Sequence, residues 1–225
     1  MTFNIAIDGP AGSGKSTIAK IAANKLGFIY VDTGALYRAI AYYMLENNID
    51  VNAENSVSKL CEEITVSISY EEDIQQIYLN DKNVTNFIRT EKVGKTASII
   101  SAYAKVRETL LSIQRNIANK ENVIMDGRDI ASFVLPNAQL KIYLTASSKI
   151  RAKRRYEQLK CLGVDSNIDD IKTEIIKRDE RDMNRAIAPL KRVDEAVLLD
   201  TSDMDIEEVA EKIITMCEEI MSIRS

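Results

Sequence analysis

The sequence predicts an α/β fold in which helices wrap a five-stranded parallel sheet. Three observations favour this fold class. Short apolar segments alternate with helical patterns along most of the chain. A glycine-rich loop follows the first apolar segment and precedes the first helical pattern. The 225 residues, 45% of them hydrophobic, are enough to bury one large core.

Five apolar segments are the candidate strands of this sheet. They span residues 3–8, 28–31, 123–126, 140–144 and 197–200. The first helix is expected from about Lys15 to Leu26, because Gly27 is a natural helix terminator. The last helix should follow Asp205, where apolar residues recur at helical spacing and predict a face turned to the core.

Residues 49–92 interrupt this alternation. Apolar or aromatic side chains occupy every second position from Ile64 to Tyr70, and a further apolar segment, 74–79, precedes the polar residues 80–83. This pattern is typical of antiparallel strands joined by turns. We therefore predict a small antiparallel insert at 49–92 between the core segments 1–48 and 93–146. An arginine-rich region, 147–190, precedes the last core segment, 191–225.

The composition limits the possible partners. A net charge of −4 argues against nucleic acid, and no apolar run reaches membrane-spanning length. The three cysteines are far apart and fit a reducing compartment. The chain has no histidine, which removes the commonest general base. We expect a cytoplasmic monomer that binds small molecules rather than nucleic acid or membranes.

The loop after the first strand matches the phosphate-binding pattern G-x-x-x-x-G-K-S/T. Its glycines let several backbone N–H groups face one phosphate chain, and the following helix adds its dipole. Lys15 can reach the β- and γ-phosphates of a nucleoside triphosphate, and Ser16 can bind Mg²⁺. The predicted ATP-binding residues are Gly9, Pro10, Ala11, Gly12, Ser13, Gly14, Lys15, Ser16 and Thr17.

A nucleotide-binding loop does not by itself define a kinase. A GTPase switch would need an N-K-x-D element, and the nearest string, at 119–122, lacks the aspartate. An ATPase motor is a weaker alternative, because the chain is short and has no evident coupling element. A binding module without catalytic activity stays open.

One helical face in the arginine-rich region changes from apolar to charged. Ile171 and Ile175 begin an apolar row. The same row continues with Arg178, Asp182 and Arg185. An Arg178–Asp182 pair could be purely structural, but charges on an inward face need partners and the surplus here is positive. This face favours contact with an anionic ligand.

Charged residues also stand beside apolar ones elsewhere. Arg107 interrupts an apolar helical row, where a structural ion pair and a ligand contact are equally open. The segments 32–38 and 126–129 follow two candidate strands, at the sheet edge where α/β proteins bind ligands. Asp126 has the position of a Mg²⁺-binding carboxylate, although an acid that merely ends a strand is an equal alternative.

Four strings together resemble the bacterial cytidylate kinase family over nearly the whole chain. They are IDGPAGSGKS at 7–16, DTGALYR at 32–38, DGRD at 126–129 and RDERDMNRA at 178–186. The resemblance implies a P-loop nucleoside monophosphate kinase fold with sheet order 2-3-1-4-5. It makes 49–92 the monophosphate-binding insert and 147–190 a mobile lid. The implied reaction is Mg²⁺-assisted transfer of the γ-phosphoryl group of ATP to CMP or dCMP.

The resemblance also implies roles for individual residues. The acceptor phosphate would meet Arg38, Arg128 and Arg178. Cytosine would meet Ser98, Arg107 and Asp129, with Arg185 nearby; the sugar would meet Asp182, and Thr33 would line the same pocket. Ser16 would bind Mg²⁺, with Asp126 acting through water. The catalytic set would be Lys15, Arg128, Arg151, Arg155 and Arg181, of which the last three would serve the transferring phosphoryl group.

One geometric condition follows from these roles. Ser98 and Arg107 are nine residues apart, so on one straight helix they would face opposite sides. Both can reach one base only if the helix breaks, which we expect near 101–103.

Another P-loop kinase, acting on a different monophosphate or on a shikimate-like alcohol, is the main alternative.

Overall fold

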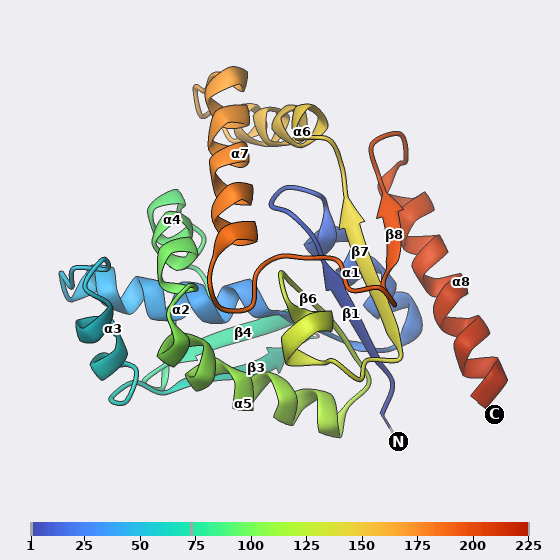
Figure 1. Cartoon of the computed structure of the whole chain (residues 1–225), viewed down its shortest axis with the longest axis horizontal. Helices are drawn as coiled ribbons and strands as arrows, with labels where there is room; N and C mark the ends of the chain where they lie inside the picture. The colour runs from blue at the N-terminus through green and yellow to red at the C-terminus, as the bar shows by residue number, and fades with distance from the viewer. Residues whose placement is uncertain (1, 73, 225) are drawn as a thin grey trace.

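The computed structural model describes residues 2–72 and 74–224. Its main sheet consists of five parallel strands, β1 (Asn4–Asp8), β2 (Ile29–Asp32), β6 (Val123–Gly127), β7 (Leu140–Thr145) and β8 (Val197–Asp200). In space they run β2-β6-β1-β7-β8 (Figure 1). Counted along the chain, this is the predicted order 2-3-1-4-5, and all five predicted strands are confirmed.

Side chains of the central strand alternate between two hydrophobic layers. Ile5 and Ile7 pack against α1 (Lys15–Leu26) and α8 (Ile206–Arg224). Ala6 faces the opposite layer, where Val31 and Met125 pack beside the short π-helix η1 (Ile130–Val134). Strand side chains alternate because successive residues point to opposite faces of a sheet. These two layers hold the main sheet between its helices, and the phosphate loop extends from the end of its central strand.

The insert forms a separate antiparallel sheet with the order β3-β4-β5. Its elements are α3 (Glu54–Leu60), β3 (Val66–Glu71), β4 (Ile74–Leu79) and β5 (Lys82–Asn83). It packs on α2 (Thr33–Glu46) through a hydrophobic cluster that contains Val66, Ile77 and Leu36. Gln75 ties it to the end of β2, because its amide oxygen accepts from the Asp32 N–H at 2.8 Å. The antiparallel strands are confirmed, and α3 is an element that the sequence pattern missed.

The expected break divides one helical region into α4 (Glu91–Ile100) and α5 (Ala104–Lys120). Within the break, the Ser101 hydroxyl donates to the Ser98 carbonyl at 3.0 Å. The Tyr103 hydroxyl donates to the Val51 carbonyl at 2.9 Å and so ties the break to the chain that leads into the insert. The prediction of a break at 101–103 is confirmed.

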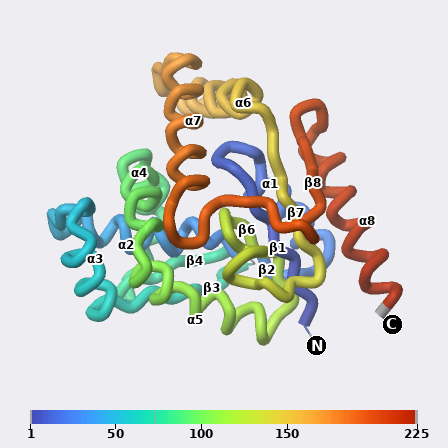
Figure 2. The backbone as a smooth tube through the Cα atoms, viewed as in Figure 1, coloured from blue at the N-terminus to red at the C-terminus, as the bar shows by residue number. Residues whose placement is uncertain are grey.

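The arginine-rich region contains α6 (Ser148–Cys161) and α7 (Ile168–Asn184), which project beyond the end of β7 (Figure 1). Asn167 caps α7 by accepting hydrogen bonds from the N–H groups of Asp169 and Asp170. Figure 2 traces the segment 185–196 from the end of α7 across to β8. Within residues 2–72 and 74–224, no helix combines the length and the apolar character that crossing a membrane requires.

Candidate active site

A cleft opens at the carboxyl edge of the main sheet, beside the phosphate loop. The ends of β2 and β6, the helices α2, α4, α5 and α7 and the first residue beyond α7 supply its walls. The nine residues predicted to bind the acceptor all line it: Thr33, Arg38, Ser98, Arg107, Arg128, Asp129, Arg178, Asp182 and Arg185. Ser16 and Asp126 line it too. Residues far apart in the sequence therefore share one cavity at the edge where α/β sheets bind ligands.

The phosphate loop has the tight course that its glycines predict. Gly9 has a φ of +153°, and a Cβ there would lie 1.9 Å from the Leu144 carbonyl oxygen, so no side chain fits. The Lys15 ammonium donates to the Pro10 carbonyl at 2.7 Å and to the Ser13 hydroxyl at 3.2 Å. Burial, together with the positive charge of Arg128, lowers the pKa of Lys15 well below its usual value. A bound phosphate chain would supply the negative charge that this buried cation lacks.

Ser16 and Asp126 form an oxygen-rich pair next to the loop. The Ser16 hydroxyl donates to one Asp126 carboxylate oxygen at 2.9 Å, and the Tyr30 hydroxyl donates to the other at 2.8 Å. Burial raises the pKa of Asp126, and the nearby charge of Asp32 adds to the rise. Oxygen ligands of this kind suit Mg²⁺, which commonly takes one or two protein ligands plus phosphates and waters. The pair therefore fits the expected Mg²⁺ position.

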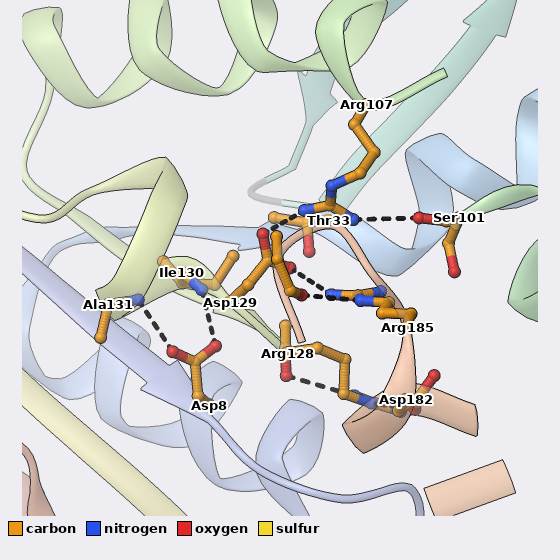
Figure 3. A network of polar contacts seen from close by, with 12 residues as sticks. Asp8, Thr33, Ser101, Arg107, Arg128, Asp129, Ile130, Ala131, Asp182 and Arg185 are labelled. Carbon is orange, nitrogen blue, oxygen red and sulfur yellow. Dashed lines mark hydrogen bonds and ion pairs between the residues drawn. The ribbon is translucent and has the colours of Figure 1, made fainter. Parts of the chain in front are cut away.

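The cleft contains arginines that are already paired with acids (Figure 3). Arg128 Nε lies 2.8 Å from an Asp182 carboxylate oxygen, and the Asp182 side chain is only 6% exposed. Burial of Asp182 opposes ionisation, but Arg128 and Arg178 outweigh it and hold the pKa of this carboxyl below its usual value. The structural alternative for Arg178, an ion pair with Asp182, is therefore not what the structure shows, because Asp182 pairs with Arg128.

A second cluster lies deeper in the cleft, where Asp129 stands between two arginines (Figure 3). Arg107 bonds to one Asp129 oxygen and donates to the Ser101 carbonyl at 3.2 Å. Arg185 lies 3.0 Å from the other Asp129 oxygen and donates to the Ala188 carbonyl at 2.7 Å. At most 7% of each of the three charged side chains is exposed. Buried charges need such partners, and the two arginines together exceed the single acid by one positive charge.

Other polar groups in the cleft have no such partner. In the described chain, Arg178 Nε and the Ser98 hydroxyl are buried without a hydrogen-bond partner. Burial, with the nearby charge of Arg128, lowers the pKa of Arg178 to about 10. Burial also lowers the pKa of Arg38. An unpaired buried polar group is costly, so these side chains indicate a polar, anionic ligand between them.

The three lid arginines do not line the cleft. Arg151 is buried and structural in this state, since it donates to the Ala11 carbonyl at 2.9 Å and lies 2.7 Å from Asp179. Arg155 donates to Gln158 at 2.7 Å. Arg181 is exposed on α7. The structure thus gathers the predicted acceptor residues but not Arg155 or Arg181.

Three features of the site escaped the sequence reasoning. Arg89 lines the cleft and lies 2.7 Å from Asp32, whose other oxygen accepts the N–H of Ala35 at the start of α2. Tyr37 also lines the cleft. Asp8, buried at the end of β1, accepts the N–H groups that begin η1 (Figure 3). Asp32 before a helix is a recognisable cap signal, and Tyr37 and Asp8 lie within strings that carry the family resemblance, whereas Arg89 has no local pattern.

The arrangement joins two anion sites. The phosphate loop can bind the phosphates of a nucleoside triphosphate, and the neighbouring cleft offers surplus positive charge with hydrogen-bonding groups behind it. Such a geometry can hold a donor and an acceptor phosphate in line and neutralise the charge between them. The site is therefore suited to phosphoryl transfer.

Known proteins support the same interpretation. The chain is 45% identical to the cytidylate kinase of Carboxydothermus hydrogenoformans, over 94% of this chain and 96% of that protein. It is 46% identical to the cytidylate kinase of Bacillus licheniformis, over 93% of each chain. A gluconokinase structure from Sinorhizobium meliloti is similar in fold alone, with a TM-score of 0.50, 14% identity and coverage of 99% of this chain and 97% of that one. The family described as cytidylate kinase matches residues 5–219, and the chain therefore belongs to the cytidylate kinase family.

Proposed function

We propose that this chain transfers the γ-phosphoryl group of ATP to CMP or dCMP, giving ADP and CDP or dCDP. Membership of the cytidylate kinase family supports the reaction. The observation in the site that carries it is the buried, unpartnered Nε of Arg178 in a cleft beside the phosphate loop. An arginine in this position needs an anion, and the phosphate of a nucleoside monophosphate supplies one.

The donor lies along the phosphate loop. The backbone N–H groups of residues 9–17, other than Pro10, bind its phosphates, and Lys15 leaves its contacts with Pro10 and Ser13 to reach them. Ser16 would bind Mg²⁺ directly, with Asp126 behind it through water. When bound, Mg²⁺ neutralises charge on the β- and γ-phosphates.

The acceptor occupies the cleft. Its phosphate contacts Arg38, Arg128 and Arg178, its sugar lies against Asp182, and Thr33 lines the pocket beside them. Its base lies against Ser98, Arg107 and Asp129, with Arg185 behind the carboxylate. The base contacts favour cytosine, because each Asp129 oxygen keeps a lone pair beyond its bond to arginine and can accept from the cytosine amino group. Uracil has a carbonyl oxygen at that position and would be repelled.

The lid, 147–190, completes the site around the reacting phosphates. The attacking phosphate oxygen is already anionic, so no strong general base is required and the lack of histidine costs nothing. Lid closure would bring Arg155 and Arg181 toward the γ-phosphoryl group and exclude water that would otherwise hydrolyse ATP. Arg151 would hold the phosphate loop in place, as its bond to the Ala11 carbonyl indicates.

A coupled assay of ADP release tests the proposal. We expect turnover with CMP and dCMP well above that with UMP, AMP, GMP and shikimate. Comparable kcat/KM values for CMP and UMP would contradict the base assignment, and turnover with shikimate would favour the alternative kinase class. Acceptor-independent binding of ATP, with no turnover on any acceptor, would favour a binding module. A monomeric state and a cytoplasmic location stay predictions.

A further inference from the structure

Phe133 contacts Arg107, a member of the cluster of Arg107, Asp129 and Arg185, from outside the cleft. It lies on η1, four residues after Asp129, and 37% of the residue is exposed. The Arg107 guanidinium carbon lies 5.5 Å from the centre of the Phe133 ring and 5.7 Å from the centre of the Tyr37 ring. Both distances fall within the range of cation–π contacts. Tyr37 lines the cleft, whereas Phe133 does not, and the Phe133 ring meets the cleft residues through Arg107. The Phe133 N–H also donates to the Asp129 carbonyl at 2.9 Å, a backbone bond that side-chain substitutions keep.

Arg107 needs more than its hydrogen bonds to stay in one orientation. Asp129 and the Ser101 carbonyl engage its two terminal nitrogens, while its Nε is buried without a hydrogen-bond partner in the described chain. A long arginine side chain has several competing rotamers, and a planar guanidinium recognises a base edge only in the correct plane. Contact with the rings of Phe133 and Tyr37 restricts the orientation of the guanidinium plane.

The backbone of η1 is fixed at both ends, which makes Phe133 a rigid support. At the start, the N–H groups of Ile130 and Ala131 donate to Asp8 at 2.7 and 2.8 Å. At the end, Arg115 donates to the carbonyls of Phe133 and Val134 at 2.9 and 3.0 Å. Arg115 lies on α5, as Arg107 does, about two turns away. One helix therefore carries the arginine and also holds the segment that presents the phenyl ring to it.

We propose that Phe133 is a positioning residue for base recognition, which holds the Arg107 guanidinium in the plane where Arg107 and Asp129 together bind cytosine. This inference rests on the proposed function. Its consequence is that base selectivity depends on a side chain that makes no contact with the nucleotide.

The test compares Phe133→Leu with Phe133→Tyr. Leucine removes the ring, so the KM for CMP should rise by about three- to thirtyfold, the range from a solvent-exposed to a desolvated cation–π contact. The preference for CMP over UMP should fall, while the KM for ATP and kcat stay within about twofold. Tyrosine keeps the ring and should restore both the KM and the preference. Phe87→Leu is the matched control, because Phe87 is 52% exposed, stacks on Tyr42 and does not line the cleft.

A double-mutant cycle with Arg107→Gln, which removes the cation that faces the ring, identifies the route of the effect. If Phe133 acts through Arg107, adding Phe133→Leu to Arg107→Gln should change the KM for CMP no further. A Phe133→Leu variant with a lower melting temperature but unchanged KM and base preference would overturn the inference and leave only a packing role. If the parent enzyme lacked a preference for CMP, the proposed function itself would fail, and that result is visible before any variant is made.

Discussion

Two parts of the site differ in how far their side chains are already in place without ligand. We call the cleft the acceptor half, and the phosphate loop together with Arg155 and Arg181 the donor half. In the acceptor half, Arg128, Arg107 and Arg185 are already paired with Asp182 and Asp129, so the side chains that we propose for the base and the sugar are held in place without ligand. In the donor half, Lys15 bonds to its own loop, and the lid residues Arg155 and Arg181 do not line the cleft.

This difference separates recognition from catalysis. A preformed pocket binds its ligand at a lower cost in side-chain entropy and can select among bases before any chemistry occurs. Groups that arrive only with the donor and the closed lid contribute to the transition state instead, and their late arrival protects ATP from water. Changes in the donor half should therefore lower kcat, and changes in the acceptor half should raise the KM for CMP.

The largest effect is expected for Arg181→Ala, which tests the donor half. Loss of a charge that stabilises the transferring phosphoryl group should lower kcat by about 10³-fold, with much less change in the KM for CMP. Steady-state kinetics of the coupled reaction measure both. Lys177→Ala removes another exposed cation of α7 and is the control. A kcat near that of the parent enzyme would exclude Arg181 from the mechanism.

Arg178→Met tests the acceptor half. Loss of a charge-assisted contact with the CMP phosphate should raise the KM for CMP by about 10- to 100-fold. The melting temperature without ligand should change little, because the Nε of Arg178 is buried without a partner and its attraction to Asp182 is offset by repulsion from Arg128. Calorimetry and kinetics on the same preparations measure the two quantities. A clear drop in melting temperature would show that Arg178 has a structural partner and would weaken the comparison.

Asp129→Asn sharpens the comparison within the acceptor half. An amide in this position can turn its NH₂ group toward the base, so the preference for CMP over UMP should fall by about tenfold. The ratio of kcat/KM for the two nucleotides is the measurement. An unchanged ratio would mean that another group distinguishes the bases.

The smallest effect concerns Asp8, which lies between the two halves. Burial raises the pKa of this carboxyl to about 7. The protonated form then favours the folded state, so the stabilisation is complete below the usual pKa of 3.8, declines as pH rises above it and is lost once pH has passed through the folded pKa. The free energy of unfolding should fall by about 1 kcal/mol between about pH 6 and pH 8.

Denaturant titrations at several pH values would detect this slope, because the chain has no histidine to mask it. Asp8→Asn should flatten the slope, and Asp165→Asn, at an exposed position, should not. An equal slope in the parent enzyme and in Asp8→Asn would show that Asp8 is ionised throughout this range.

Local patterns in the sequence predicted most of the strands and helices. The site residues that the sequence did not reveal depend on contacts between residues far apart in the chain. The strands, the glycine loop and the break before Ala104 follow from periodicity and from the reach of side chains. Arg89 meets Asp32 across 57 positions, and Asp8 meets Ile130 across 122. No spacing rule links such residues, because the fold alone brings them together.

Arg151 illustrates a different limit of the sequence. An arginine near a helix start is compatible with phosphate binding and with internal pairing, and the two cannot be distinguished by position. The structure gives Arg151 two backbone carbonyls and Asp179 as partners, so its charge supports the loop rather than facing the cleft. The residues that the resemblance assigns to the acceptor line one cleft, and their roles stay predictions.

The break between α4 and α5 acts as a spacer in this protein. Residues 101–103 connect α4 to α5, so deleting one of them would shorten the connection and displace α5, and Arg107 with it, relative to Ser98. Substitutions that preserve the length should matter less than any change of length. In cytidylate kinases with this architecture, insertions and deletions should therefore avoid these three positions even where their residue types vary freely.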